Sequence, residues 1–147
     1  MTDMTLAGLP DPDEFPEIYA DTPIKRAAAW LVDAALIGGL WLALTLATFG
    51  LAVLLLPLLP LVGFIYRWAT MARGSATLGM RLMGMEIRRH DGARLDPATA
   101  FLHVAGYAAS MVAFPAQLLS MGLMLATPRR QGLTDHVLGT APMNRLR

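Results

Sequence analysis

Asp33 is the residue of this sequence whose type and position point most directly to chemistry. It is the only charged residue between Ala27 and Tyr66. A carboxylate within so apolar a helix costs about 2.5–3.5 kcal/mol to place in a membrane, so we expect it to face a partner or a water-filled cavity. There it could bind a proton or a cation, or it could form a structural hydrogen bond between helices.

Two further charged residues could act together with Asp33. Arg26 precedes it by seven residues, so the two share a helix face within about 20° but are too far apart for a direct ion pair. Water, a ligand or a group from another segment must therefore bridge them. Asp135 follows a later apolar stretch, and we expect it at the same interface as Arg26. Three more polar residues are secondary candidates: His103, Arg130 and His136.

Long apolar stretches provide the helices that would position these residues. A membrane span needs about 20 apolar residues, so the first stretch predicts two spans, at residues 24–47 and 51–72. A turn is expected at residues 48–50, where glycine ends a helix readily. Pro57 and Pro60 lie inside the second span, and we expect a kink there.

The rest of the chain predicts a polar loop followed by a second apolar block. The loop, residues 73–97, should contain a short strand at 83–88 that ends at an Asp-Gly turn and pairs with residues 139–143. The block at residues 98–127 has no Lys, Arg, Asp or Glu and is interrupted at Phe114-Pro115. It fits one kinked span or a re-entrant hairpin, and we favour the hairpin because it keeps the following arginines on the cytoplasmic side.

The fold class that results is an α-helical integral membrane protein. It has two full transmembrane helices, a third apolar helix or re-entrant hairpin, and a small cytoplasmic β element. None of the 12 Lys and Arg residues lies between the two spans, and positive residues near span ends stay cytoplasmic. We therefore expect a cytoplasmic N-terminus, with a flexible acidic tail at residues 1–23 and a basic C-terminus at residues 144–147.

The composition also limits the classes of partner that we expect the chain to bind. A net charge of +1, without a basic patch, argues against nucleic acid. The expected partners are the lipid bilayer and a second copy of the chain or another membrane protein. A row of small residues, each four positions apart, would let helices pack closely, either within the chain or between copies: Ala35, Gly39, Ala43 and Ala47.

These features together resemble the RDD family of membrane proteins, named for an Arg and two Asp. The resemblance covers about residues 23–143. It rests on the following residues and motifs: Arg26, Asp33, Thr77-Leu78-Gly79, Gly84-Met85-Glu86-Ile87, Asp91-Gly92 and the segment Gln131-Gly132-Leu133-Thr134-Asp135-His136-Val137-Leu138-Gly139-Thr140. The sequence departs from the family where His136 follows the closing Asp instead of preceding it. The resemblance implies a small bacterial inner-membrane protein suspected of transport.

Two functional hypotheses follow for the Arg26, Asp33 and Asp135 cluster. In the first, the chain is a transporter or channel component for an ion or small solute, with Asp33 as the binding carboxylate and Arg26 as its counter-charge. In the second, it is a non-transporting accessory or assembly subunit, and the cluster is a structural clamp. The sequence contains no nucleophile–base pair and no metal-spaced His and carboxylate set, so we expect no enzyme, no metal and no cofactor.

Overall fold

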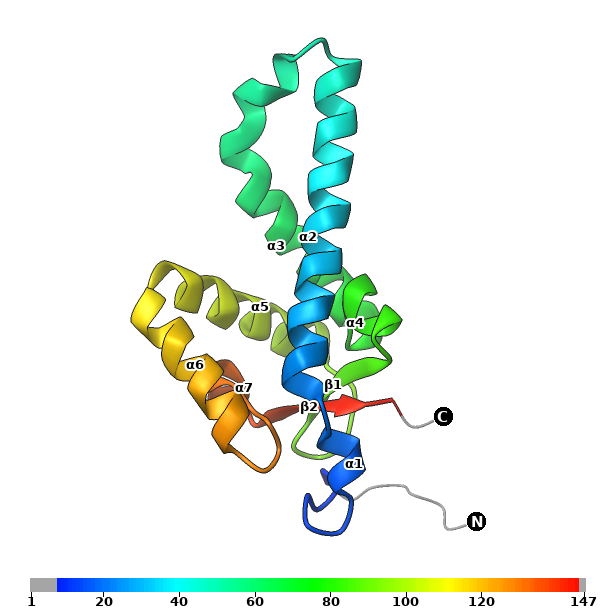
Figure 1. Cartoon of the computed structure of the whole chain (residues 1–147), viewed down its shortest axis with the longest axis vertical. Helices are drawn as coiled ribbons and strands as arrows, with labels where there is room; N and C mark the ends of the chain where they lie inside the picture. The colour runs from blue at the N-terminus through cyan, green and yellow to red at the C-terminus, as the bar shows by residue number, and fades with distance from the viewer. Residues whose placement is uncertain (1–7, 146–147) are drawn as a thin grey trace.

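Two long apolar arms form a hairpin that dominates the structure. The computed structural model describes residues 8–145. Helix α2 (Thr22–Ala47) forms one arm, and the chain returns along a 3₁₀ helix, η1 (Leu51–Leu58), and helix α3 (Leu59–Gly74), as Figure 1 shows. Both arms are long and apolar enough to cross a membrane. The two predicted spans are confirmed as helices of this kind, to within two residues at each end.

The returning arm is not one continuous α-helix. Its first half, η1, contains Pro57, and Pro60 lies in the first turn of α3. Proline has no N–H, so neither residue can donate the hydrogen bond that an α-helix needs to the carbonyl four residues back. The kink expected at Pro57 and Pro60 is thus a change from a 3₁₀ helix to an α-helix. At the tip, Phe49 and Gly50 both have positive φ, 51° and 91°, which reverses the chain.

The short helix α4 (Leu78–Leu82) follows α3 and lies against α2. Thr77 begins it, because the Thr77 hydroxyl oxygen accepts a hydrogen bond from the Met80 N–H at 3.2 Å. A Cβ on Gly79 would overlap the Ala29 carbonyl oxygen of α2. Glycine is therefore the residue that lets these two helices approach so closely.

A two-stranded antiparallel sheet lies at the opposite end of the molecule from the hairpin tip. Strand β1 (Met85–Arg89) pairs with strand β2 (Thr140–Asn144). The predicted pairing of residues 83–88 with 139–143 is confirmed, with the ends moved by one or two residues. Ile87 of β1 is fully buried and packs in a core with residues of α3 and α5.

The second apolar block folds into two helices joined by a sharp bend. Helix α5 (Pro97–Val112) and helix α6 (Phe114–Ala126) are bent by 118° at the break between them. Pro115 lies in the first turn of α6, where it cannot continue the hydrogen bonds of α5. The short helix α7 (Leu133–Leu138) then leads into β2 (Figure 1). This geometry suits a broken span or a re-entrant hairpin.

The segment before α2 packs against the sheet, which corrects the prediction of a flexible tail at residues 1–23. Of that tail, residues 1–7 lie outside the described residues. The short helix α1 (Pro16–Tyr19) is held against β2 by Tyr19, which is 2% exposed. The Tyr19 hydroxyl donates a hydrogen bond to the Pro10 carbonyl oxygen at 2.8 Å. The prolines prevent a long helix here, but they permit a compact segment anchored by one aromatic side chain.

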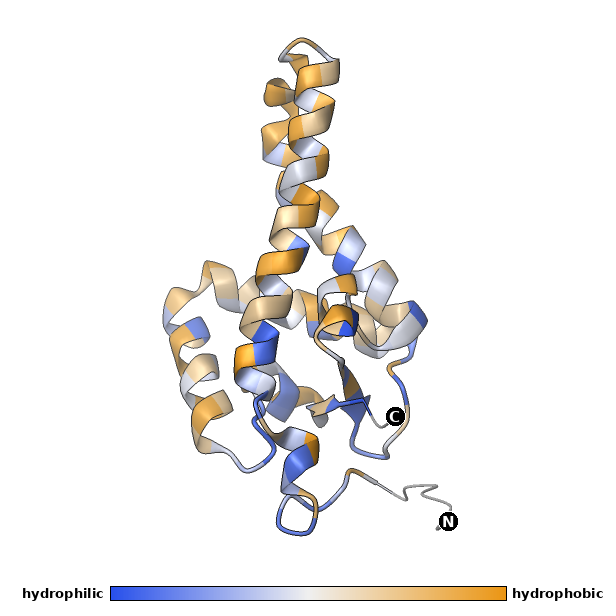
Figure 2. Ribbon diagram, turned by 45° about the vertical axis from the view of Figure 1, so that its right-hand side comes forward, coloured by the Kyte–Doolittle hydropathy of each residue, from blue (hydrophilic) through white to orange (hydrophobic). Residues whose placement is uncertain are grey.

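The C-terminal segment predicted at residues 144–147 begins inside the sheet, since Asn144 ends β2. Its side-chain amide donates to the carbonyl oxygens of Glu17 and Ala20, at 2.8 and 3.0 Å, and its Oδ1 accepts from Lys25 at 2.7 Å. Figure 2 shows hydrophilic residues concentrated at this end and hydrophobic residues along the hairpin. The segment before α2 and strand β2 therefore hold the polar end of the fold together.

Candidate functional site

Asp135 is the centre of a buried polar cluster. It lies in the first turn of α7 and is 0% exposed. Its Oδ2 lies 2.5 Å from Arg26 Nη1 and accepts a hydrogen bond from the Gly132 N–H at 2.9 Å. Its Oδ1 lies 2.9 Å from His103 Nε2 and accepts from the Thr140 hydroxyl at 2.9 Å. We call these residues the Asp135 cluster. It joins α2, α5, α7 and β2 at one carboxylate.

The position of Asp135 follows from local sequence. An acidic residue three places into a helix accepts a hydrogen bond from the backbone at the helix start, and the Gly132 N–H is that donor. Gly139 ends α7 with φ of 64°, a left-handed value that glycine adopts readily. The chain then reverses into β2, and Thr140 reaches back to Asp135. The prediction that Asp135 lies beside Arg26 is confirmed by their ion pair.

The electrostatics of this cluster give a pH prediction. Burial alone would raise the pKa of Asp135, but the Arg26 guanidinium and the His103 ring lower it well below its usual range. A carboxyl with a lowered folded pKa contributes stability above its unfolded pKa, near 3.8, and that stability is lost as pH falls further. The melting temperature in detergent should therefore hold from pH 7 to about pH 4 and fall below it. In Arg26→Gln the folded pKa of Asp135 lies closer to its unfolded value, so the fall should begin at the same pH and be smaller. Circular dichroism melts at several pH values test this, and identical acid profiles for both proteins would contradict it.

Asp33 is the centre of a second polar cluster, one that links the two arms of the hairpin. The side chain is 1% exposed. Its Oδ1 accepts hydrogen bonds from the Tyr66 hydroxyl at 2.7 Å and the Gly79 N–H at 2.9 Å. Its Oδ2 lies 3.6 Å from Arg67 Nη1. Within residues 8–145, Oδ2 has no hydrogen-bond partner. We call Asp33, Tyr66, Arg67 and Gly79 the Asp33 cluster.

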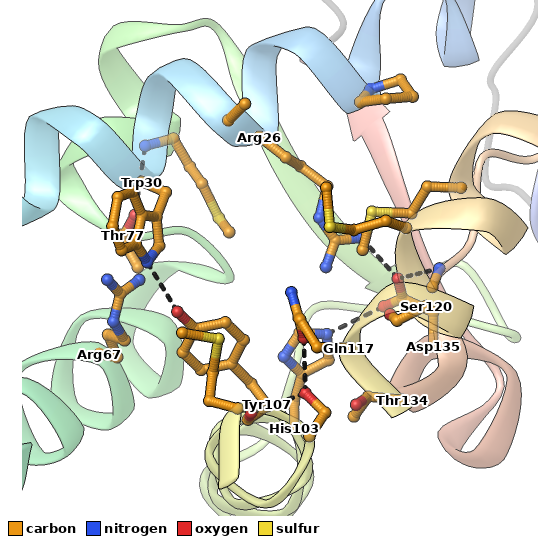
Figure 3. Close-up of a pocket in the computed structure, with 18 of the residues that line it drawn as sticks. Arg26, Trp30, Arg67, Thr77, His103, Tyr107, Gln117, Ser120, Thr134 and Asp135 are labelled. Carbon is orange, nitrogen blue, oxygen red and sulfur yellow. Dashed lines mark hydrogen bonds and ion pairs between the residues drawn. The ribbon is translucent and has the colours of Figure 1, made fainter. Parts of the chain in front are cut away.

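Residues of both clusters line one cavity between α2 and the bent pair α5–α6. Its volume is about 660 Å³, within the range of small-molecule sites. Figure 3 shows that Trp30 and Tyr107 meet across it, where the Trp30 indole N–H donates to the Tyr107 hydroxyl at 2.7 Å. Arg26, Asp33, Arg67 and Asp135 all contribute to its wall. The single cluster predicted for Arg26, Asp33 and Asp135 is therefore two clusters that share one cavity. Arg26 pairs with Asp135, and Asp33 lies nearest to Arg67.

The sequence matches a known protein family over the region that forms this site. The RDD family matches residues 21–139 of the sequence, most of the chain. The chain belongs to the RDD family. Comparisons with curated proteins and with solved structures gave no significant match. The matched RDD region runs from the start of α2 to the end of α7, so it includes both buried aspartates. Thr140 lies one residue beyond it.

The secondary candidates of this RDD chain divide between the cavity and the surface. His103 lies in the cavity wall and contacts Asp135. His136 is exposed, and its Nδ1 lies 2.9 Å from the Gly132 carbonyl oxygen. Arg130 donates to the Leu125 carbonyl oxygen at 2.6 Å, at the end of α6. The structure therefore brings His103 into the site and places Arg130 and His136 outside the cavity.

Tyr66 and Arg67 are site residues of this RDD chain that sequence reasoning missed. Arg67 lies inside the predicted second span, at residues 51–72, so that span also holds a charged residue, as the first holds Asp33. A second charge within a span was the signal that could have identified it, because the buried carboxylate of Asp33 requires a partner. The Gly79 N–H left no such signal, since a backbone donor has no residue type of its own.

Proposed function

We propose that this chain is a multi-pass protein of the bacterial cytoplasmic membrane, with its N-terminus in the cytoplasm. Two helical arms of spanning length support this, as does the absence of Lys and Arg from residues 27–66. Large apolar side chains along the hairpin are exposed, among them Leu40 at 72% and Phe49 at 99%. Lipid tails are the surroundings in which such a surface is favourable.

Within that membrane we propose that the chain is a transport component for a proton, a small cation or a small solute. The observation that carries the proposal is Asp33, a nearly fully buried carboxylate in a cavity wall whose Oδ2 lacks a hydrogen bond within residues 8–145. Buried intramembrane carboxylates typically mark ion or proton pathways. Arg67, at 3.6 Å, is a nearer counter-charge than Arg26, which is engaged with Asp135. The proposal includes no catalytic step, metal or cofactor.

Flux through proteoliposomes tests this function. In vesicles with an entrapped pH dye, Asp33→Asn should reduce proton-linked flux at least tenfold, because the amide cannot carry the charge or the proton of the carboxylate. Tyr66→Phe keeps the carboxylate and removes one hydrogen bond, so it should change the rate while leaving flux measurable. Asp91→Asn, at an exposed turn, is the matched control. Unchanged flux in a folded Asp33→Asn protein would exclude the transport role.

A second candidate is a non-transporting accessory or assembly subunit. The Asp135 cluster favours it, because four groups satisfy both oxygens of Asp135, as a structural clamp requires. In that case Asp33→Asn should lower the folded yield or abolish a co-purifying membrane partner, and wild-type vesicles should show no flux above protein-free vesicles. The small size of the chain suits a homo-oligomer or a larger complex under either function.

A further inference from the structure

We propose that the cavity binds the headgroup of a phospholipid that carries both a phosphate and a protonated primary amine, as phosphatidylethanolamine does. Arg67 and Arg26 would donate to the phosphate, and Asp33 Oδ2 would accept from the ammonium. The inference rests on the proposed function in placing the cavity within the bilayer. A transported proton or cation and the lipid ammonium would compete for the same carboxylate.

The arginines of the cavity wall have more donors than the chain satisfies. The Arg67 guanidinium makes no hydrogen bond to any group among residues 8–145. It lies over the Tyr107 ring at 5.3 Å, and Nη1 lies 3.6 Å from Asp33 Oδ2. The Arg26 side chain donates one hydrogen bond among residues 8–145, to Asp135. A guanidinium presents five N–H groups in a planar fork that matches phosphate oxygens. Figure 3 shows Arg67 on one side of the Trp30–Tyr107 hydrogen bond and Arg26 on the other, both in the wall of the same cavity.

Asp33 Oδ2 is an acceptor without a hydrogen bond among residues 8–145, and it indicates that the headgroup also carries a positive charge. Asp135 uses both of its oxygens within its own cluster. Asp33 Oδ2 lacks a hydrogen bond within the part of the chain that the structure describes, although the side chain is 1% exposed. An ammonium group has three N–H donors for it. A zwitterionic headgroup therefore satisfies both arginines and Asp33, and it adds no net charge to a wall that holds two of each sign.

The mouth of the cavity identifies a lipid as the source of the headgroup. Its rims are apolar and exposed: Ile24 and Leu31 of α2 are 72% and 62% exposed, and Met121 and Leu125 of α6 are 53% and 67% exposed. Free phosphate or a soluble amine would leave these side chains uncovered. An acyl chain leaving between α2 and α6 would cover them and would continue into the surrounding lipid.

The test is lipid retention by purified full-length protein, measured by native mass spectrometry. The protein is reconstituted with phosphatidylethanolamine or with phosphatidylcholine, whose quaternary ammonium has no N–H, and is then extracted in detergent. We expect about one phosphatidylethanolamine per chain and at least tenfold less phosphatidylcholine. Arg67→Gln should reduce retention at least tenfold. Arg73→Gln, an exposed arginine later in α3, is the matched control and should retain the lipid as the wild type does.

A second pair of variants leaves the buried residues untouched. Met121→Trp adds bulk at the mouth and should reduce retention, whereas Leu118→Trp, exposed on α6 and absent from the cavity wall, should not. Equal retention of both lipids, or equal retention by Arg67→Gln and Arg73→Gln, would overturn the proposal. So would competition by inorganic phosphate alone, or a cross-linked dimer in which a second copy fills the cavity. Lipid retention without flux would reject the transport role and keep this inference; flux without retention would do the reverse.

Discussion

Asp135→Asn should cost this protein about 3–5 kcal/mol of folding free energy, the range for removing one partner of a buried ion pair. The substitution keeps the shape of the side chain and replaces one oxygen with an NH₂ group. Two donors face each oxygen of Asp135: Arg26 and the Gly132 N–H at Oδ2, and His103 and Thr140 at Oδ1. Whichever way the amide turns, its NH₂ faces two donors. The charge that compensates Arg26 is lost as well.

The measurement is the thermal melt of the detergent-solubilised protein together with the yield of monodisperse protein. Asp91→Asn is the control, because it makes the same chemical change at a turn. There the Asp91 side chain is 44% exposed and lies 3.2 Å from Arg89. An exposed ion pair contributes about 0–1 kcal/mol, so the control should melt close to the wild type. Equal melting temperatures for Asp135→Asn and the wild type would show that the cluster does not hold α7 and β2 against α2.

The pairing of Arg26 with Asp135 was predictable because several local signals agree on it. Asp135 precedes a glycine turn and a segment able to pair with residues 83–88, and that pairing returns the chain to the base of the first helix. Each signal depends on residue types and short spacings, which sequence reasoning can evaluate. The family resemblance placed the same residues in one motif, and the family match over residues 21–139 confirms that resemblance.

The surroundings of Asp33 were not predictable in the same way. Its partners, Arg67 and the Gly79 N–H, come from α3 and α4, and only the packed structure selects them. The cavity depends on the 118° bend between α5 and α6. The break at Phe114-Pro115 indicated a bend, but no local rule gives its angle. The ordered segment at α1 was missed because its acidic residues and prolines resemble a tail, whereas one buried tyrosine is enough to anchor it.

Gly79→Ala should destabilise the fold by at least about 3 kcal/mol, because it combines overpacking against backbone with a lost hydrogen bond to a buried charge. The new methyl group would overlap the Ala29 carbonyl oxygen of α2, and a backbone atom cannot rotate away as a side chain can. Helix α4 would have to move off α2. That movement would pull the Gly79 N–H from Asp33 Oδ1, which it now meets at 2.9 Å.

Gly38→Ala is the control that makes this result specific. Gly38 lies within α2, and a Cβ there would meet nothing within 4 Å. Alanine is a better helix former than glycine by about 1 kcal/mol, so Gly38→Ala should melt at or above the wild-type temperature. Gly79→Ala gains the same helix-forming preference of alanine within α4. A lower melting temperature for this variant must therefore come from the contacts with α2 and Asp33. If both variants are as stable as the wild type, α4 is not the element that supplies the backbone donor to the buried carboxylate.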